Sequence, residues 1–196
     1  MLIDLQPSDA ASLLIRRLNR VHGGDDLFVR RHVLKRLESR LRDGLHPDLT
    51  LPPAENETSE FVRQQFARAA YFSSSPSDRR KWNLLALEDP LQQVRAAAGL
   101  VASEAPVDLA MQFDSLECIV ESIRTDPDPF VVRVGLHSLC RILSNAHRDS
   151  DSRDRGRVDE FFRQRAIPAI ETLATTAESI PIRRFAAQTR ERIWAT

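Results

Sequence analysis

The chain has 196 residues, of which 42% are hydrophobic and 29% charged, and its formal net charge at pH 7 is zero. This composition is typical of a soluble globular protein that is long enough to bury a core. No apolar run approaches the roughly 20 residues of a membrane-spanning helix, and the first residues lack the basic and apolar regions of a signal peptide. We therefore expect an intracellular, cytoplasmic protein without membrane contact.

The first predicted elements are two helices that form an N-terminal pair over 1–44. The run "AASLLIRRLNR" favours a helix that ends at two glycines, and "LFVRRHVLKRLESRLRD" favours a second helix within 25–43. An apolar stripe follows one side of this second helix: Leu27, Leu34, Leu37 and Leu41. Another side carries a basic group, Arg31, Lys35 and Arg42, with Glu38 among them. We interpret this basic face as solvated, and the alternative is contact with an acidic partner.

Two later segments are predicted to interrupt the helices. Residues 45–58 contain prolines and no apolar periodicity, which indicates a long connection. Residues 147–157, "HRDSDSRDRGR", are charged and polar enough for a mobile, solvated insertion. We expect limited proteolysis to cut first in these two segments.

An internal repeat dominates the rest of the chain. When the sequence is aligned on Arg95, Arg133 and Arg183, apolar residues recur one position before, three after, and ten and thirteen before each arginine. These columns hold Val94, Val132, Ile182; Ala98, Leu136, Ala186; Leu85, Ile123, Leu173; and Trp82, Val120, Ile170. An acid (Asp89, Asp128, Glu178) and a proline (Pro90, Pro129, Pro181) lie between the apolar clusters. The pattern predicts helical hairpins, because proline is accepted in the first turn of a helix and an acid is favourable at its start.

The stretches "DPLQQVRAAAGL", "DPFVVRVGLHSL" and "IPIRRFAAQ" resemble the second helix of HEAT/armadillo-like repeats, and "IPAIETLATTA" at 167–177 is similar to their first helix. The resemblance covers about residues 76–196. It implies an all-α fold, a HEAT-like α-solenoid: a right-handed superhelix of about nine or ten helices in antiparallel pairs. The chain would form one domain over 1–196, with the repeats in 59–196. The resemblance also implies that the repeated acids and arginines are structural, hydrogen-bonding within and between neighbouring repeats.

No motif for catalysis or metal binding emerges from the sequence. The five histidines are scattered, no His-Glu pair occurs, and no glycine-rich phosphate loop is present. Cys118 and Cys140 fall in apolar helical patterns, so we expect buried free thiols. We therefore predict no catalytic residues, no cofactor and no bound metal ion.

Nucleic-acid binding is the alternative function, because some HEAT-like proteins are DNA glycosylases. Those enzymes need a basic concave face, nearby aromatic residues and a carboxylate. Here Trp82 falls in a core column and Trp194 lies beside the last core residue, while Asp114 and Glu117 are helix-start acids. The chain is also net acidic over 46–150, which does not favour a nucleic-acid partner.

The most specific prediction concerns the faces of the second helices that lie opposite the core columns and line the concave side in proteins of the resembled family. In the middle repeat this face holds Phe130, Val134, His137 and Arg141, about 180° from the core positions Val132, Leu136, Leu139 and Leu143. Gln92 and Arg184 hold comparable positions in the neighbouring units. An aromatic residue beside an arginine and a histidine suits binding of a peptide or helix. We expect a non-catalytic protein–protein interaction scaffold, and the alternative is that Phe130 packs on a neighbouring repeat.

Overall fold

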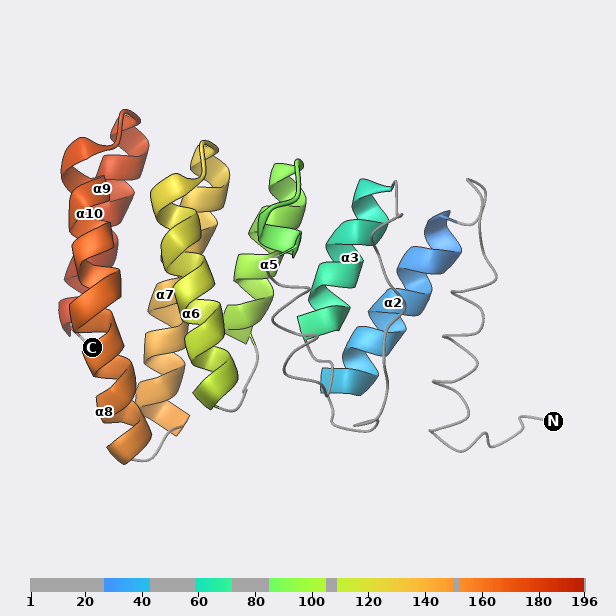
Figure 1. Cartoon of the computed structure of the whole chain (residues 1–196), viewed down its shortest axis with the longest axis horizontal. Helices are drawn as coiled ribbons and strands as arrows, with labels where there is room; N and C mark the ends of the chain where they lie inside the picture. Colours follow the sequence, from blue (N-terminus) through green and yellow to red (C-terminus); the bar gives the residue numbers. More distant parts are fainter. Residues whose placement is uncertain (1–26, 43–58, 72–84, 105–108, 150–151, 196) are drawn as a thin grey trace. The chain divides into compact units, whose positions relative to one another are not determined.

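A computed structural model describes the residues 27–42, 59–71, 85–104, 109–149 and 152–195 (Figure 1). Every regular element in these ranges is helical and none is a strand, so the all-helical prediction is confirmed for this part of the chain. The chain divides into two compact units, residues 1–98 and 99–196. The helix predicted before residue 23, the 45–58 connection and Trp82 lie outside the described residues.

In the first unit, α2 (Leu27–Arg42) packs against α3 (Glu60–Tyr71). The predicted stripe of α2 is buried at Leu34 and Leu37, and α3 buries Val62 and Phe66. A second cluster joins α3 to the start of α5 (Gln92–Glu104), the helix along which the division between the two units falls. Its buried members are Ala67, Ala86, Val94 and Ala98. The Val-Arg pair of α3 thus belongs to a helix that packs on the first clear repeat.

The second unit is built from two helical hairpins (Figure 1). The first pairs α6 (Leu109–Thr125) with α7 (Pro129–Asp149), and the other pairs α9 (Ile167–Thr176) with α10 (Ile180–Ala195). Across the hairpins, α6 packs against α9 and α7 packs against α10. We call α6 and α9 the first-helix layer and α7 and α10 the second-helix layer.

The repeat columns account for this packing. Of the aligned positions, those that the structure buries are Val94, Val132, Ile182, Ala98, Leu136, Ala186, Ile123, Val120 and Ile170. Two members of the columns differ, since Leu85 is 41% exposed and Leu173 is only half-buried. The prolines also lie as predicted, because Pro129 begins α7 and Pro181 is the second residue of α10.

The predicted break at 147–157 is instead largely helical. Helix α7 continues to Asp149, and α8 (Ser152–Phe161) begins three residues later. Helix α8 also has an apolar side, which the charge-rich sequence did not reveal. Val158 is fully buried, and the Phe161 ring packs edge-to-face on Phe113 with centroids 5.8 Å apart. Arg155 and Arg157 of this segment lie on the exposed side of α8. The extra length between the second and third repeats is therefore a further helix.

A single π-turn, η2 (Phe162–Ala166), joins α8 directly to α9. The N–H of Ile167 bonds to the carbonyl of Phe162, five residues earlier, which is the spacing of a π-helix. Pro168 follows at once; it has no N–H, and its ring would clash with a carbonyl in a regular α-helix. The wider turn accommodates the proline, so the helix predicted to begin at 167 continues one that began at Ser152.

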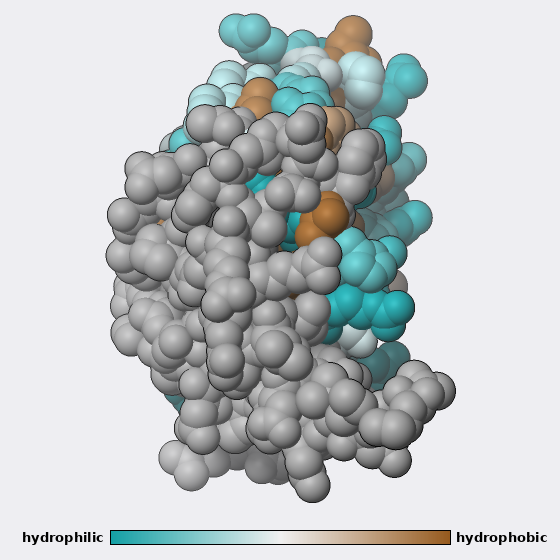
Figure 2. All heavy atoms as spheres, turned by 90° about the vertical axis from the view of Figure 1, so that its right-hand side faces the viewer, coloured by the Kyte–Doolittle hydropathy of each residue, from teal (hydrophilic) through white to brown (hydrophobic). Residues whose placement is uncertain are grey.

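On the face drawn in Figure 2, the visible described residues are mostly hydrophilic, and apolar ones appear singly. The exposed large apolar side chains in the described ranges are Phe61, Leu85, Phe130, Ile180 and Trp194. Among the helices described, none combines the length and the apolar character that crossing a bilayer requires.

Candidate partner-binding surface

The outer face of α7 carries the side chains that the sequence assigned to it. Phe130 is 46% exposed, His137 and Arg141 are exposed, and Val134 is half-buried. The opposite positions are all buried: Val132, Leu136, Leu139 and Leu143. The helical period thus predicted correctly which side of α7 faces the core. Phe130 thus keeps close to half of its surface in solvent, and the alternative that it packs on a neighbouring repeat is not tested by this exposure.

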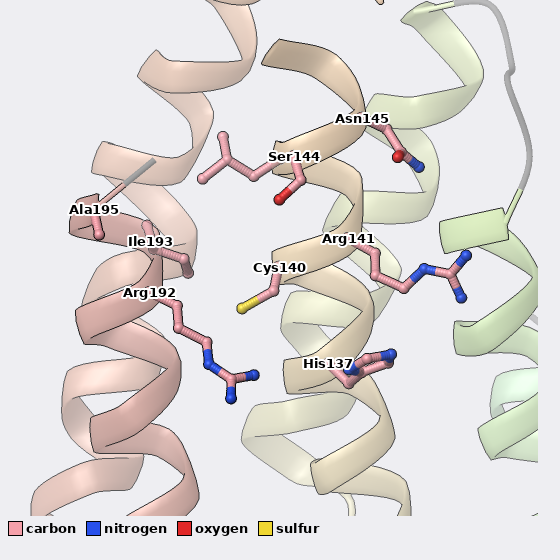
Figure 3. Close-up of a pocket in the computed structure, with 9 residues that line it drawn as sticks. His137, Cys140, Arg141, Ser144, Asn145, Arg192, Ile193 and Ala195 are labelled. Atoms are coloured by element: carbon pink, nitrogen blue, oxygen red, sulfur yellow. The ribbon is translucent and has the colours of Figure 1, made fainter. Parts of the chain in front are cut away.

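A groove of about 420 Å³ lies between α7 and α10. Its lining residues are His137, Cys140, Arg141, Leu143, Ser144, Asn145, Arg192, Ile193 and Ala195. In Figure 3 the Arg192 side chain extends from α10 toward α7, and the Cys140 thiol extends from α7 toward α10. The guanidinium of Arg141 extends to the other side of α7, so Arg141 contributes mainly its stem to the groove.

Cys140 on α7 interacts with Arg192 and Thr189 of α10 across the groove. Burial raises the pKa of its thiol, while the charge of Arg192 and a hydrogen bond with the Thr189 side chain act in the opposite direction. Neither Cys140 nor Cys118 forms a disulfide, and both are half-buried rather than fully buried as the sequence predicted. A raised pKa favours the neutral thiol near neutral pH, and a neutral thiol is a poor nucleophile. Cys140 therefore contributes a weakly polar surface to the groove rather than a reactive group.

Charge is distributed unequally between the two layers of the second unit. The second-helix layer contains seven arginines and two acidic residues, Asp149 and Glu191. The first-helix layer contains four acids, Asp114, Glu117, Glu121 and Glu171, and one arginine, Arg124. Charge summed over long stretches of sequence conceals this difference, because first and second helices alternate along the chain.

The remaining residues predicted for this face are not all brought together. Arg184 is exposed on α10, but it is not among the residues that line the groove. Gln92 is half-buried at the start of α5, in the first compact unit, and joins no described site with the others. The sequence reasoning missed Arg192 and Cys140, which become neighbours only when α7 packs against α10.

The predicted basic face of α2 is only partly supported. Arg31 and Lys35 are exposed, and the Arg31 guanidinium lies 5.6 Å from the ring centroid of Phe61 on α3. The side chain of Arg42 lies outside the described residues. Glu38, placed on the same side by the sequence analysis, is instead buried.

The buried carboxylate of Glu38 is held between α2 and α3. It accepts hydrogen bonds from Arg68 at 3.0 Å and from Gln65 at 2.5 Å. Its position is therefore explained by helix packing, because a carboxylate taken out of water needs such donors.

The repeated charges form turn-closing bonds in two of the three repeats. Arg95 donates from Nη1 to the carbonyl of Asp89 at 2.8 Å, and Arg183 donates from Nη1 to the carbonyl of Ala177 at 2.6 Å. In both cases the acceptor lies six residues before the arginine. Arg133 is exposed and makes no such bond within the described part of the chain. Asp128 accepts the backbone N–H of Phe130 at 2.8 Å, so it stabilises the start of α7.

A second cavity, of about 520 Å³, lies between the two hairpin turns. Apolar side chains from the repeat columns line it, including Ile123, Val132, Leu173 and Ile182, with Arg124, Asp126 and Glu178 also in the lining. Both charge signs are present there, whereas the described lining of the groove between α7 and α10 contains no acidic residue. In the ranges that the structure describes, no three His, Cys, Asp or Glu side chains gather into a potential metal site.

Comparison of the chain with protein-family models, with curated proteins and with solved structures finds no match.

Proposed function

We propose that this chain is a HEAT-like helical-repeat protein that acts as a non-catalytic scaffold or adaptor in the cytoplasm. Its second-helix layer would bind a peptide or helix of a partner protein. The observation that carries this proposal is the stacking of like helix on like helix, α6 on α9 and α7 on α10, which leaves the outer face of α7 exposed. Stacked hairpins of this kind present extended binding surfaces in repeat proteins.

The turn-closing arginines support the repeat interpretation. Arg95 and Arg183 occupy the same repeat column and bond to carbonyls at the same sequence distance, six residues upstream. Asp89 adds a bond between elements, because it also pairs with Arg63 of α3. Bonds within and between neighbouring repeats are what the HEAT/armadillo resemblance implies for these charges.

The composition of the second-helix layer supports a protein partner. Interface hot spots are enriched in aromatic residues and arginine. Phe130 is exposed on the layer, and His137 and Arg141 lie about two and three turns further along the same side of α7. Arginines combined with an exposed phenylalanine suit a partner segment that carries both apolar and acidic side chains.

A nucleic-acid partner is the second candidate, favoured by the seven arginines of the second-helix layer. Phosphate contacts by arginine release counterions, so binding of this kind weakens steeply as salt rises. Retention on heparin or DNA that falls steeply with salt would favour this candidate. A flat response at low salt would remove it.

Affinity capture with matched variants tests the proposal. Phe130→Ala and Arg141→Glu alter the exposed face of α7, and Glu171→Arg alters an exposed residue of α9 in the other layer. The proposal predicts that the two α7 variants lose a partner that the wild type and Glu171→Arg retain, with similar melting temperatures. If the α7 variants capture the same partner as the wild type, the assigned face is wrong.

A further inference from the structure

The side chains that line the groove between α7 and α10 indicate which kind of protein segment would bind there. This inference rests on the proposed function. Three of the described residues that line the groove are basic in type, His137, Arg141 and Arg192, and of these Arg192 directs its guanidinium into the groove. None of the described lining residues is acidic. The lining also contains the aliphatic side chains of Leu143, Ile193 and Ala195. The groove therefore offers one cationic and one apolar contact region within the same small volume.

Size limits what can enter. About 420 Å³ lies near the lower end of the range of roughly 300–1,000 Å³ for sites that enclose small ligands. A whole helix does not fit in this space, but one or two side chains of a segment that lies across α7 and α10 do. The volume of the groove thus suits a local side-chain pair rather than an extended segment.

The positive charge lies where it would meet an entering side chain. The Arg192 guanidinium extends from α10 toward α7 across the groove, whereas the His137 ring is directed to the side of α7 to which Arg141 extends (Figure 3). An arginine binds a carboxylate through two parallel hydrogen bonds, a geometry that neither an amide nor a hydroxyl reproduces. The buried side chains of Leu143 and Ile193 add an apolar contact beside it.

We propose that this groove binds an acidic segment of a partner protein. A glutamate or aspartate of the segment would pair with Arg192, and an adjacent aliphatic side chain would lie on Leu143 and Ile193. The apolar lining favours a protein over a nucleic acid, because a single-stranded nucleic acid requires aromatic stacking platforms and duplex DNA requires a row of phosphate contacts. None of the described lining residues is Phe, Tyr or Trp.

Two labelled peptides test this selectivity. One is a peptide of Glu and Leu with its glutamates and leucines at helical spacing, and the other has Gln in place of every Glu. Fluorescence anisotropy with the full chain should show that the Glu peptide binds at least about tenfold more tightly, since a bidentate carboxylate contact is lost in the Gln peptide. Equal affinity for the two peptides, or no binding of either, would overturn the proposal.

Two arginine variants locate the contact. Arg192→Gln should weaken binding of the Glu peptide about tenfold. Arg184→Gln should leave it nearly unchanged, because Arg184 is exposed on the same helix but does not line the groove. Equal losses in both variants would indicate diffuse attraction to the layer and refute a contact in the groove. A labelled DNA duplex that binds more tightly than the Glu peptide and depends equally on Arg192 would also refute it.

A measurement on the unmodified chain avoids dependence on any variant folding. Saturation with the Glu peptide should slow alkylation of Cys140, which lines the groove, and leave alkylation of Cys118 on α6 unchanged; mass spectrometry distinguishes the two sites. Unchanged alkylation of Cys140 would contradict occupancy of the groove. A natural partner that maps to α7 and α10, together with equal affinity for the Glu and Gln peptides, would preserve the proposed function and reject the acidic segment alone.

Discussion

Arg63 of α3 donates a hydrogen bond from Nε to Oδ2 of Asp89 over 2.8 Å, although the two residues are 26 positions apart. The other oxygen of Asp89 accepts the backbone N–H of Leu91 at 2.9 Å, and its backbone carbonyl accepts the Arg95 guanidinium. One aspartate thus orders the turn before α5 and joins that turn to α3. The Arg63–Asp89 pair therefore links the first clear repeat to α3, whose sequence lacks a complete repeat.

Replacing Arg63 by Ala should lower the free energy of unfolding by about 1–3 kcal/mol, because the carboxylate of Asp89 is largely buried and loses its charged partner. A double-mutant cycle with Asp89→Ala, followed by urea denaturation, isolates the pair from the other contacts of each residue. We expect a coupling energy of about 0.5–3 kcal/mol. Strictly additive losses would show that the two side chains act independently.

Gly135 of α7 tests the packing of α7 against α6. A Cβ at this position would lie 2.5 Å from Cγ2 of Ile123, a stiff branched side chain. Gly135→Ala should therefore destabilise the fold, because overpacking costs about 1–3 kcal/mol and exceeds the gain of about 1 kcal/mol in helix propensity.

The matched control is Gly156→Ala in α8, where a Cβ meets nothing within 4 Å. This variant should gain up to about 1 kcal/mol, because alanine favours a helix over glycine. Thermal or urea unfolding of both variants measures the contrast. Similar shifts in both would mean that α6 and α7 do not approach closely at Gly135.

Leu136 and Leu173 hold equivalent core columns in the sequence, but the structure separates them. Leu136 is fully buried, whereas Leu173 is half-buried and lines the cavity between the hairpin turns. Leu136→Ala should cost about 2–5 kcal/mol, and Leu173→Ala about 1 kcal/mol, because less apolar area leaves water there on folding. Urea denaturation measures both changes. Equal losses of unfolding free energy in the two variants would instead agree with the repeat columns, in which both leucines are equivalent core residues.

The alkylation rate of Cys140 should respond to pH as its raised pKa requires. Burial favours the neutral thiol, so the thiolate should form at a higher pH than in an exposed cysteine. The charge of Arg192 lowers the pKa, so Arg192→Gln should move the midpoint of the rate profile to still higher pH. Maleimide labelling across a pH series, read by mass spectrometry, measures both midpoints. A midpoint that moves to lower pH in the variant would contradict the assigned electrostatic effect of Arg192.

Periodicity was sufficient to predict the helices and their buried sides. Val132, Leu136 and Leu139 face the core because their spacing matches the helical repeat, which is a local property of the sequence. The same reasoning failed at 147–157, where abundant charge masked a helical segment that leads into the buried residue Val158. Its burial depends on partners distant in sequence, as the contact of Phe161 with Phe113 illustrates.

The groove was harder to predict than the face on which it lies. Phe130, His137 and Arg141 could be identified from one helix, because they lie opposite its core positions. Arg192 and Cys140 belong to different hairpins, and the charge of one affects the pKa of the other only after α10 packs on α7. The spacing of residues within α7 or within α10 alone does not predict that Arg192 and Cys140 are neighbours.

Site-specific photo-crosslinking to a captured partner tests most directly whether the second-helix layer is the binding surface. A photoreactive amino acid would replace Arg141 or Arg184 in the second-helix layer, and Glu121 or Glu171 in the first-helix layer; all four side chains are exposed. We predict crosslinks to the partner from positions 141 and 184 and none from 121 and 171. Crosslinks that come mainly from 121 and 171, with 141 and 184 silent, would contradict the assignment of the binding surface to α7 and α10.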